Sequence, residues 1–366
     1  MKKRVLALTC AVCLSVTVTA CGKEQQYDII ESESLSDDGQ MYEAVDDTQN
    51  ITDEEGEEAS SQEEVAPEES ESNKEAVVSE ESAEGLNFKD LSTRQFYFNS
   101  GTGAWSECFT IEKDGYFTGH LSDFNQWETG EGYPDGTFYG CSYSGHFADI
   151  AKVGEYVHEM KLTDISYKDE PGTEELFDGE KHVNLGAYFL GAGDTFQIYL
   201  PGMPLGEMSE ELYMWVCDHN QSESELTMIV LVDEKKELAA YSVDRFTPAE
   251  DAEMTYNSYK QSFDYCAGKL ANDAQTTVDM VAYSGKMYEI SDDCLNELWN
   301  LIRYNVPEDR YAKILEEQRA WIKEKEEKAK EIADVYAGGS MASVDVNAVL
   351  AQLTIERCAK LVEYLQ

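Results

Sequence analysis

Cys21 is the residue whose surroundings most clearly indicate covalent chemistry. It follows the small residues Thr19 and Ala20 and precedes Gly22, and its thiol is a nucleophile that can accept a lipid. Upstream, three cations at positions 2–4 precede a mostly apolar run, Val5–Val18. This order is typical of a secretory signal peptide, and the run is too short for a bilayer core of ~30 Å. The sequence therefore predicts a signal peptide over residues 1–20 and lipid attachment at Cys21.

The same stretch resembles the cleavage site of bacterial lipoproteins, in which the cysteine becomes the N-terminus and carries a diacylglyceryl thioether. The resemblance implies a protein anchored by lipid at the outer face of the bacterial cytoplasmic membrane, in the cell envelope. An ordinary signal peptide that happens to contain a cysteine is the alternative interpretation.

Other reactive residue types show no pattern that predicts catalysis. The histidines are scattered, and His120 with Asp123 fits a cross-strand histidine better than a metal-ligand pair. The chain contains no G-x-S-x-G, no P-loop and no H-E-x-x-H. Its 74 acidic residues allow many carboxylate pairs, but no spacing singles one out. We therefore assign no catalytic residue, no metal ligand and no cofactor.

Residues 21–85 predict an acidic, disordered tether. From Glu24 to Gly85 there are 23 acidic residues and one lysine, Lys74, with no Trp or Phe. Such a composition cannot bury enough apolar surface to offset the entropy of ordering, and its self-repulsion extends it. A solvated stalk is favoured over an acidic tail that binds a basic partner.

The remaining 280 or so residues are long enough for two folded domains. They are still acidic, which argues against nucleic acid as a partner, because binding it needs clustered Lys and Arg. A cationic partner suits this charge better, while the oligomeric state stays open.

Residues 86–246 predict a β-rich domain. Lys113-Asp114-Gly115 and Pro134-Asp135-Gly136 are turn patterns, and a short helix is expected near Glu207–Val216. The strands fit a barrel or a sandwich, with the barrel favoured, and their aromatic residues are expected to fill its interior rather than form a ligand-binding face. The expected strands are Gln95–Asn99, Trp105–Glu112, Tyr116–Ser122, Thr137–Phe147, Tyr156–Ser166, Asn184–Phe189, Thr195–Leu200, Glu225–Val232 and Glu237–Val243.

Part of this domain also resembles an uncharacterised module. The string Phe96–Trp105, followed by Asp114–Gly119, is similar to a β-rich module common in lipoproteins of Firmicutes. A looser similarity to the first strand of lipocalin-type barrels adds weight to the barrel.

Residues 247–366 predict an all-α hairpin or bundle. Thr247 and Glu250 form a capping-box pattern with Pro248 at the first helical position. Gly338-Gly339 is expected to end a helix, since glycine accepts the left-handed conformation there. Apolar residues at spacings of three and four predict helices over Pro248–Ala271, Thr276–Arg303, Pro307–Ala337 and Ser343–Tyr364.

Four motifs within residues 276–366 carry a more specific resemblance. They are Asp292–Trp299, Glu317–Ile322 with its Q-R-A-W string, Gly338–Met341, and Leu353–Arg357 followed by Leu361. In order and spacing they resemble the LprI-type lysozyme-inhibitor domain. The resemblance implies a helical domain that inhibits lysozyme or contacts a similar cell-wall-acting protein.

The chain departs from that family in its cysteines. Family members often carry a pair that looks suited to bridging two helices, and those places hold Ala329 and Val349 here. Other cysteines could form pairs Cys108–Cys141 and Cys266–Cys294, or all six could be free thiols.

Gln318, Arg319 and Arg357 are the candidate binding residues of the helical domain. In the favoured interpretation the two arginines pair with Glu316, Glu356 or Asp292 and fix the helix register. In the other they contact a partner. The chain as a whole then suggests an envelope-anchored binding protein, and a cell-envelope enzyme acting on glycan or peptide through the β-rich domain is the alternative.

Overall fold

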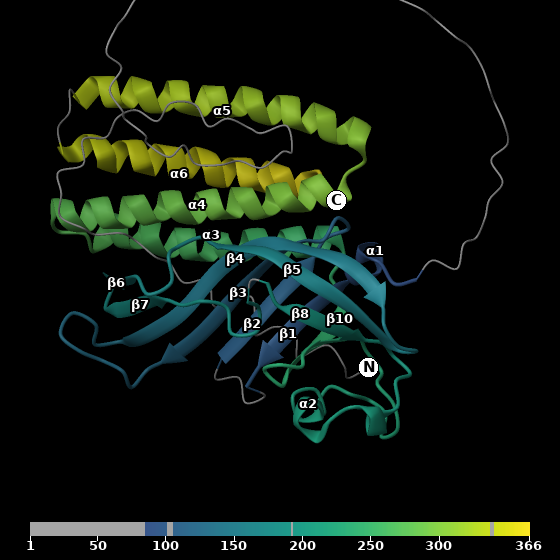
Figure 1. Cartoon of the computed structure of the whole chain (residues 1–366). Coiled ribbons are helices and arrows are strands. Elements are labelled where there is room, and N and C mark those ends of the chain that lie inside the picture. The colour runs from purple at the N-terminus through teal and green to yellow at the C-terminus, as the bar shows by residue number, and fades with distance from the viewer. Residues whose placement is uncertain (1–84, 101–104, 192, 337–339) are drawn as a thin grey trace, which may run out of the picture.

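The computed structural model describes residues 85–100, 105–191, 193–336 and 340–366. The predicted signal peptide, Cys21, the predicted tether up to residue 84, and the Gly338-Gly339 turn lie outside these residues. Within the described residues an antiparallel β-barrel is followed by four long helices (Figure 1).

Eight strands close the barrel. The order is β1-β2-β3-β4-β5-β8-β9-β10, and it closes because β10 pairs with β1, with Phe96 opposite Ser242. The predicted barrel is thus confirmed over the sandwich. The strands are β1 (Arg94–Asn99), β2 (Trp105–Ile111), β3 (Tyr116–Asn125), β4 (Gly136–Lys152), β5 (Val157–Tyr167), β8 (Thr195–Tyr199), β9 (Val230–Asp233) and β10 (Leu238–Asp244).

The long strand β4 makes closure possible. It pairs with β3 along its first part and with β5 along its second, and its pairing with β5 shifts register near His146 and Ala148. Such shifts bend and twist a strand, which a small barrel needs. The predicted turn at Gly115 is also present: its φ is +89°, and a Cβ there would lie 2.4 Å from the Phe147 carbonyl oxygen.

Aromatic side chains fill the barrel interior, as expected from the sequence. Strands β1 and β2 each alternate buried and half-buried residues, so every second side chain points inward. The buried rings stack and tilt against one another, and they include Phe96, Phe98, Phe109, Phe117, Phe147, Phe189 and Phe196.

Two strand predictions in this region differ from the structure. Of the expected strand Glu225–Val232, only Val230–Val232 lies in a strand, β9. The run Asn184–Phe189 is a loop, and strand β7 (Glu180–Asn184) ends where it begins. Phe189 and Leu190 are buried from this loop, so tertiary burial rather than strand pairing explains the apolar run. Strand β6 (Glu174–Phe177), which the sequence did not predict, pairs with β7, and β7 adds in parallel to the start of β4.

Three short helical segments accompany the barrel. The expected helix near Glu207–Val216 is present as α2 (Glu210–Met214), capped by Ser209, and it follows a 3₁₀ turn, η1 (Leu205–Glu207). Helix α1 (Phe88–Leu91) precedes β1.

The first long helix begins at its predicted cap, and the other three begin within three residues of their expected starts. Thr247 and Glu250 form the expected capping box, and Thr276 forms a second one with Asp279. In Figure 1, α3 and α4 lie against the barrel, α6 covers α4, and α5 is outermost. The helices are α3 (Pro248–Asn272), α4 (Thr277–Asn305), α5 (Glu308–Tyr336) and α6 (Ser340–Glu363).

All six cysteines of the described residues are free thiols, so neither Cys108–Cys141 nor Cys266–Cys294 forms a disulfide. Cys294 and Cys358 instead contribute to the helical core, with Cys358 Sγ 3.6 Å from the carbonyl oxygen of Ser291.

Among the described helices, none has the length and apolar character needed to cross a membrane.

Candidate functional site

The motif residues of the helical domain meet in the seam between α5 and α6. Gln318 on α5 is fully buried and Arg357 on α6 is 7 % exposed. The Arg357 Nε donates a hydrogen bond to Gln318 Oε1 at 2.8 Å. The guanidinium also lies near the rings of Trp321 and Tyr364, at 6.0 and 5.9 Å from their centroids. This contact fixes α5 against α6 through a buried charge that aromatic faces and an amide stabilise.

The predicted pairing of the arginines with carboxylates is wrong. Arg357 bonds to an amide, while Glu356 accepts from Gln352 and Asp292 accepts from Asn296. The reason is helix geometry, because Arg357 points into the seam where Gln318 lies and Glu356 points to solvent.

Arg319 differs from the other two candidates. It is exposed on α5, and among the described residues it forms no ion pair within 4 Å. Of the three candidate binding residues, Arg319 alone presents its charge to solvent.

Sequence reasoning missed a second buried cation, Lys325. Its side chain is 4 % exposed, and its Nζ lies 5.3 Å from the Trp321 ring centroid and 5.8 Å from that of Tyr288 on α4. Burial raises the pKa of Asp292, and the charge of Lys325 opposes this rise. The spacing could have revealed it, because Gln318, Trp321 and Lys325 follow each other at three and four residues and share one helix face.

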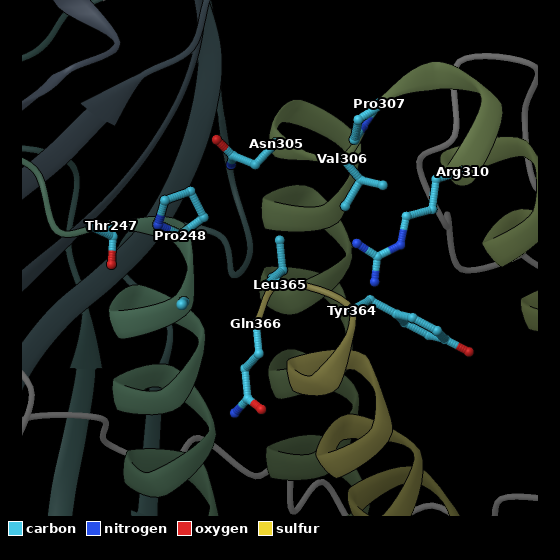
Figure 2. Close-up of a pocket in the computed structure, with 10 residues that line it drawn as sticks. Thr247, Pro248, Asn305, Val306, Pro307, Arg310, Tyr364, Leu365 and Gln366 are labelled. Atoms are coloured by element: carbon cyan, nitrogen blue, oxygen red, sulfur yellow. The ribbon is translucent and has the colours of Figure 1, made fainter.

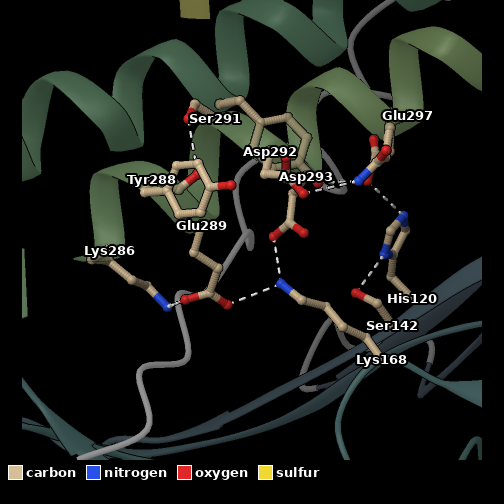
Figure 3. A network of polar contacts seen from close by, with 12 residues as sticks. His120, Ser142, Lys168, Lys286, Tyr288, Glu289, Ser291, Asp292, Asp293 and Glu297 are labelled. Atoms are coloured by element: carbon tan, nitrogen blue, oxygen red, sulfur yellow. Dashed lines mark hydrogen bonds and ion pairs between the residues drawn. The ribbon is translucent and has the colours of Figure 1, made fainter. Parts of the chain in front are cut away.

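The face of α4 toward the barrel carries an acidic row that the barrel neutralises (Figure 3). Lys168, just after β5, places its Nζ 2.9 Å from Glu289 Oε1 and 2.6 Å from Asp293 Oδ2. Glu289 also accepts from Lys286 at 2.8 Å. Because positive charges already occupy these carboxylates, this row is not available to a cationic partner.

His120 extends the same network along α4. Its Nε2 lies 3.7 Å from Glu297 Oε1, and its Nδ1 lies 3.2 Å from the hydroxyl of Ser142. Asp123 is not among these contacts of His120. The two residues therefore do not form the metal-ligand pair considered in the sequence analysis. Among the described residues no three His, Cys, Asp or Glu side chains are placed to hold a metal ion.

The β6–β7 hairpin forms a second attachment point. Asp178 at its turn accepts from the hydroxyls of Tyr265 and Tyr283, at 2.5 and 2.8 Å, and from Lys269 Nζ at 3.2 Å. These bonds hold the pKa of Asp178 below its usual value against the effect of burial. The hairpin, absent from the sequence prediction, thus ties the barrel to α3 and α4.

Inside the barrel, one carboxylate is buried among the aromatic rings. Glu107 is 0 % exposed and accepts from the Tyr143 hydroxyl at 2.8 Å and from the backbone N–H groups of Tyr188 and Phe189, at 2.7 and 3.0 Å. Burial raises its pKa, and these hydrogen bonds oppose the rise. Glu107 therefore anchors the loop that contains Tyr188 and Phe189 to the barrel interior.

A small cavity of about 270 Å³ lies where α3 and α5 begin (Figure 2). Arg310 points into this region beside Tyr364, with Asn305 and Val306 on its other side. Glu308 and Asp309 lie in the first turn of α5, directly before Arg310.

The fold is a closed β-barrel with a filled interior, followed by a domain of four long helices. Residues 266–361 match the family model described as lysozyme inhibitor LprI. The match covers about a quarter of the chain, from the end of α3 to the end of α6. No curated protein and no solved structure matches the chain.

Proposed function

We propose that this protein is an extracytoplasmic, lipid-anchored binding protein whose helical domain inhibits a lysozyme or binds a similar cell-wall-acting protein. The match of residues 266–361 to the lysozyme-inhibitor family carries the proposal. The lipid would be attached at Cys21, and the acidic segment up to Gly85 would connect it to the barrel.

The arrangement of the two parts supports a binding role. The barrel holds the inner face of the helical domain through Lys168 and Asp178, so it fixes the orientation of the helices. Helices α5 and α6 lie on the side away from the barrel (Figure 1). A partner would therefore reach these two helices, with the barrel serving as a platform.

The charge of the helical domain suits a basic partner. Residues 247–366 contain 22 acidic and 13 basic residues. Long-range attraction of this kind raises association rates and weakens with salt, while the contact itself decides specificity.

Lysozyme inhibition is the direct test. The lytic activity of a basic c-type lysozyme on a cell-wall suspension would be measured at increasing concentrations of the purified protein, at low and at physiological salt. Polyglutamate of equal charge is the control for attraction by charge alone. Inhibition that exceeds this control and survives physiological salt is the expected result; its absence at both salt concentrations would refute lysozyme as the target.

A further inference from the structure

A groove runs between the last turns of α5 and the first turns of α6. Its volume is about 450 Å³, against ~30 Å³ for one water molecule in the liquid, so it has room for protein side chains. Its floor is aliphatic, with Ile332 and Val335 from α5 and Ala348 and Val349 from α6.

The floor is more accessible than a helix seam normally is. Val335 is 78 % exposed, and Ile332, Ala348 and Val349 are only half-buried. Single exposed apolar residues are common, but four that line one groove form a surface that another molecule can cover.

Acidic side chains line the rim on both helices. Glu331 lies on α5 and Asp345 on α6. Glu331 pairs with Lys328 at 3.1 Å, but both side chains are more than half exposed, so this ion pair is weak and a competing cation can replace it. An aliphatic floor between two carboxylates fits an apolar side chain that has a cation beside it.

Charge decides between the molecules that could occupy the groove. The chain's own acidic segment has 23 carboxylates and one lysine between Glu24 and Gly85, so the rim repels it. A second copy of a chain with a net charge of −46 is repelled in the same way.

We propose that this groove is the docking site for a cationic partner protein, and that it takes an aliphatic side chain flanked by Lys or Arg. The site rests on the proposed function, since it is where the lysozyme-like partner would bind. Neither the motif seam at Gln318 nor the acidic row at Asp293 offers a comparable surface, because both are already filled within the chain.

Two exposed substitutions test the site without touching the core. Val335→Ser removes apolar floor, and Glu331→Lys reverses a rim charge. The matched controls are Met214→Ser, an exposed methionine at the end of α2, and Glu316→Lys, an exposed acid about 22 Å away along α5 at ~1.5 Å per residue. Circular dichroism of each variant checks that the fold is kept.

Binding would be measured by calorimetry with two probes, using the full-length protein. One is a basic c-type lysozyme, and the other is a synthetic peptide of alternating leucine and lysine, with a leucine–glutamate peptide as its control. We expect each groove substitution to weaken binding of both cationic probes about tenfold, with the two controls unchanged.

The outcomes separate this site from the proposed function. If lysozyme binds and the groove variants bind it equally well, the site is wrong and the function stands. If lysozyme does not bind, lysozyme is not the target, and the leucine–lysine peptide alone decides the site. Failure of that peptide to bind, or binding that Val335→Ser and Glu331→Lys leave unchanged, overturns the site. Self-association that these variants abolish overturns it too, since a second copy would then be the occupant.

Discussion

Lys168 of the barrel lies 2.6 Å from Asp293 of α4, although 125 residues separate them in the chain. The same ammonium lies 2.9 Å from Glu289, so one lysine joins two carboxylates of the helical domain. Burial raises the pKa of Asp293, and the charge of Lys168 limits this rise. The barrel and the helices are therefore coupled through a half-buried ionic contact.

Replacing Lys168 tests that coupling. Lys168→Met leaves Glu289 and Asp293 close together without their shared cation, so we expect the free energy of unfolding to fall by about 1–3 kcal/mol. Lys161→Met, at an exposed lysine of β5 without an ion pair among the described residues, is the control. Denaturant unfolding of both variants measures the difference, and equal stabilities would show that the contact is dispensable.

The seam between α5 and α6 can be tested with a double-mutant cycle. Gln318→Leu leaves the Arg357 Nε without its acceptor, and Arg357→Met leaves the buried amide without its donor. Each single substitution should cost about 1–3 kcal/mol, and the double variant should cost less than the sum. Strict additivity would mean that the two side chains do not stabilise each other.

Deprotonation of Lys286 should make the free energy of unfolding depend on pH in the alkaline range. Its side chain is fully buried, and burial lowers its pKa to about 8, although Glu289 opposes this effect. Between this value and the unperturbed 10.5 the unfolded chain binds more protons, so wild-type stability gains with rising pH.

The comparison is with Lys286→Met, which keeps the volume and removes the charge. Relative to this variant, the wild type should gain on the order of 2–3 kcal/mol between pH 8 and 10.5. At pH 7 the variant should be equally stable or more stable, because Glu289 keeps Lys168 as a partner. Chemical unfolding at a series of pH values measures this difference. If the free energies of unfolding of the two proteins change in parallel with pH, the lowered pKa of Lys286 is contradicted.

Ionisation of Glu107 should make the stability fall, not rise, with increasing pH, and it should do so at acidic pH. Its pKa is raised above 4.5 in the folded barrel, so the folded state keeps a proton that the unfolded chain has released. Stability from this group is complete below pH 4.5 and is lost as the pH rises through the raised pKa. Wild-type stability should therefore decline relative to Glu107→Gln over this window, as measured by urea unfolding. Glu155→Gln, at an exposed position, reports the background.

Lipid attachment predicts a chemical label. In cells grown with radiolabelled palmitate, the wild-type protein should carry the label and sediment with membranes, whereas Cys21→Ala should do neither. Cys217→Ala is the control, since its thiol lies in the barrel domain and should not affect labelling. A Cys21→Ala protein that is still labelled and still sediments with membranes would refute the anchor.

The sequence by itself determined the fold class of both parts and most of their elements. Runs of aromatic and β-branched residues between turn residues predict strands, and the capping box at Thr247 marks a helix start, because these patterns depend on neighbours a few residues apart. The order of the motifs also indicates the family whose model matches residues 266–361.

Only the tertiary structure decided which polar groups meet. Arg357 forms its hydrogen bond with Gln318, 39 residues away, and not with the carboxylates near it in sequence. Lys168 of the barrel bonds to Asp293 of α4. The loop at Phe189 enters the barrel to bond Glu107, although its apolar run looks like a strand. Such contacts depend on how strands close and helices cross, and local sequence patterns do not encode separations of this length.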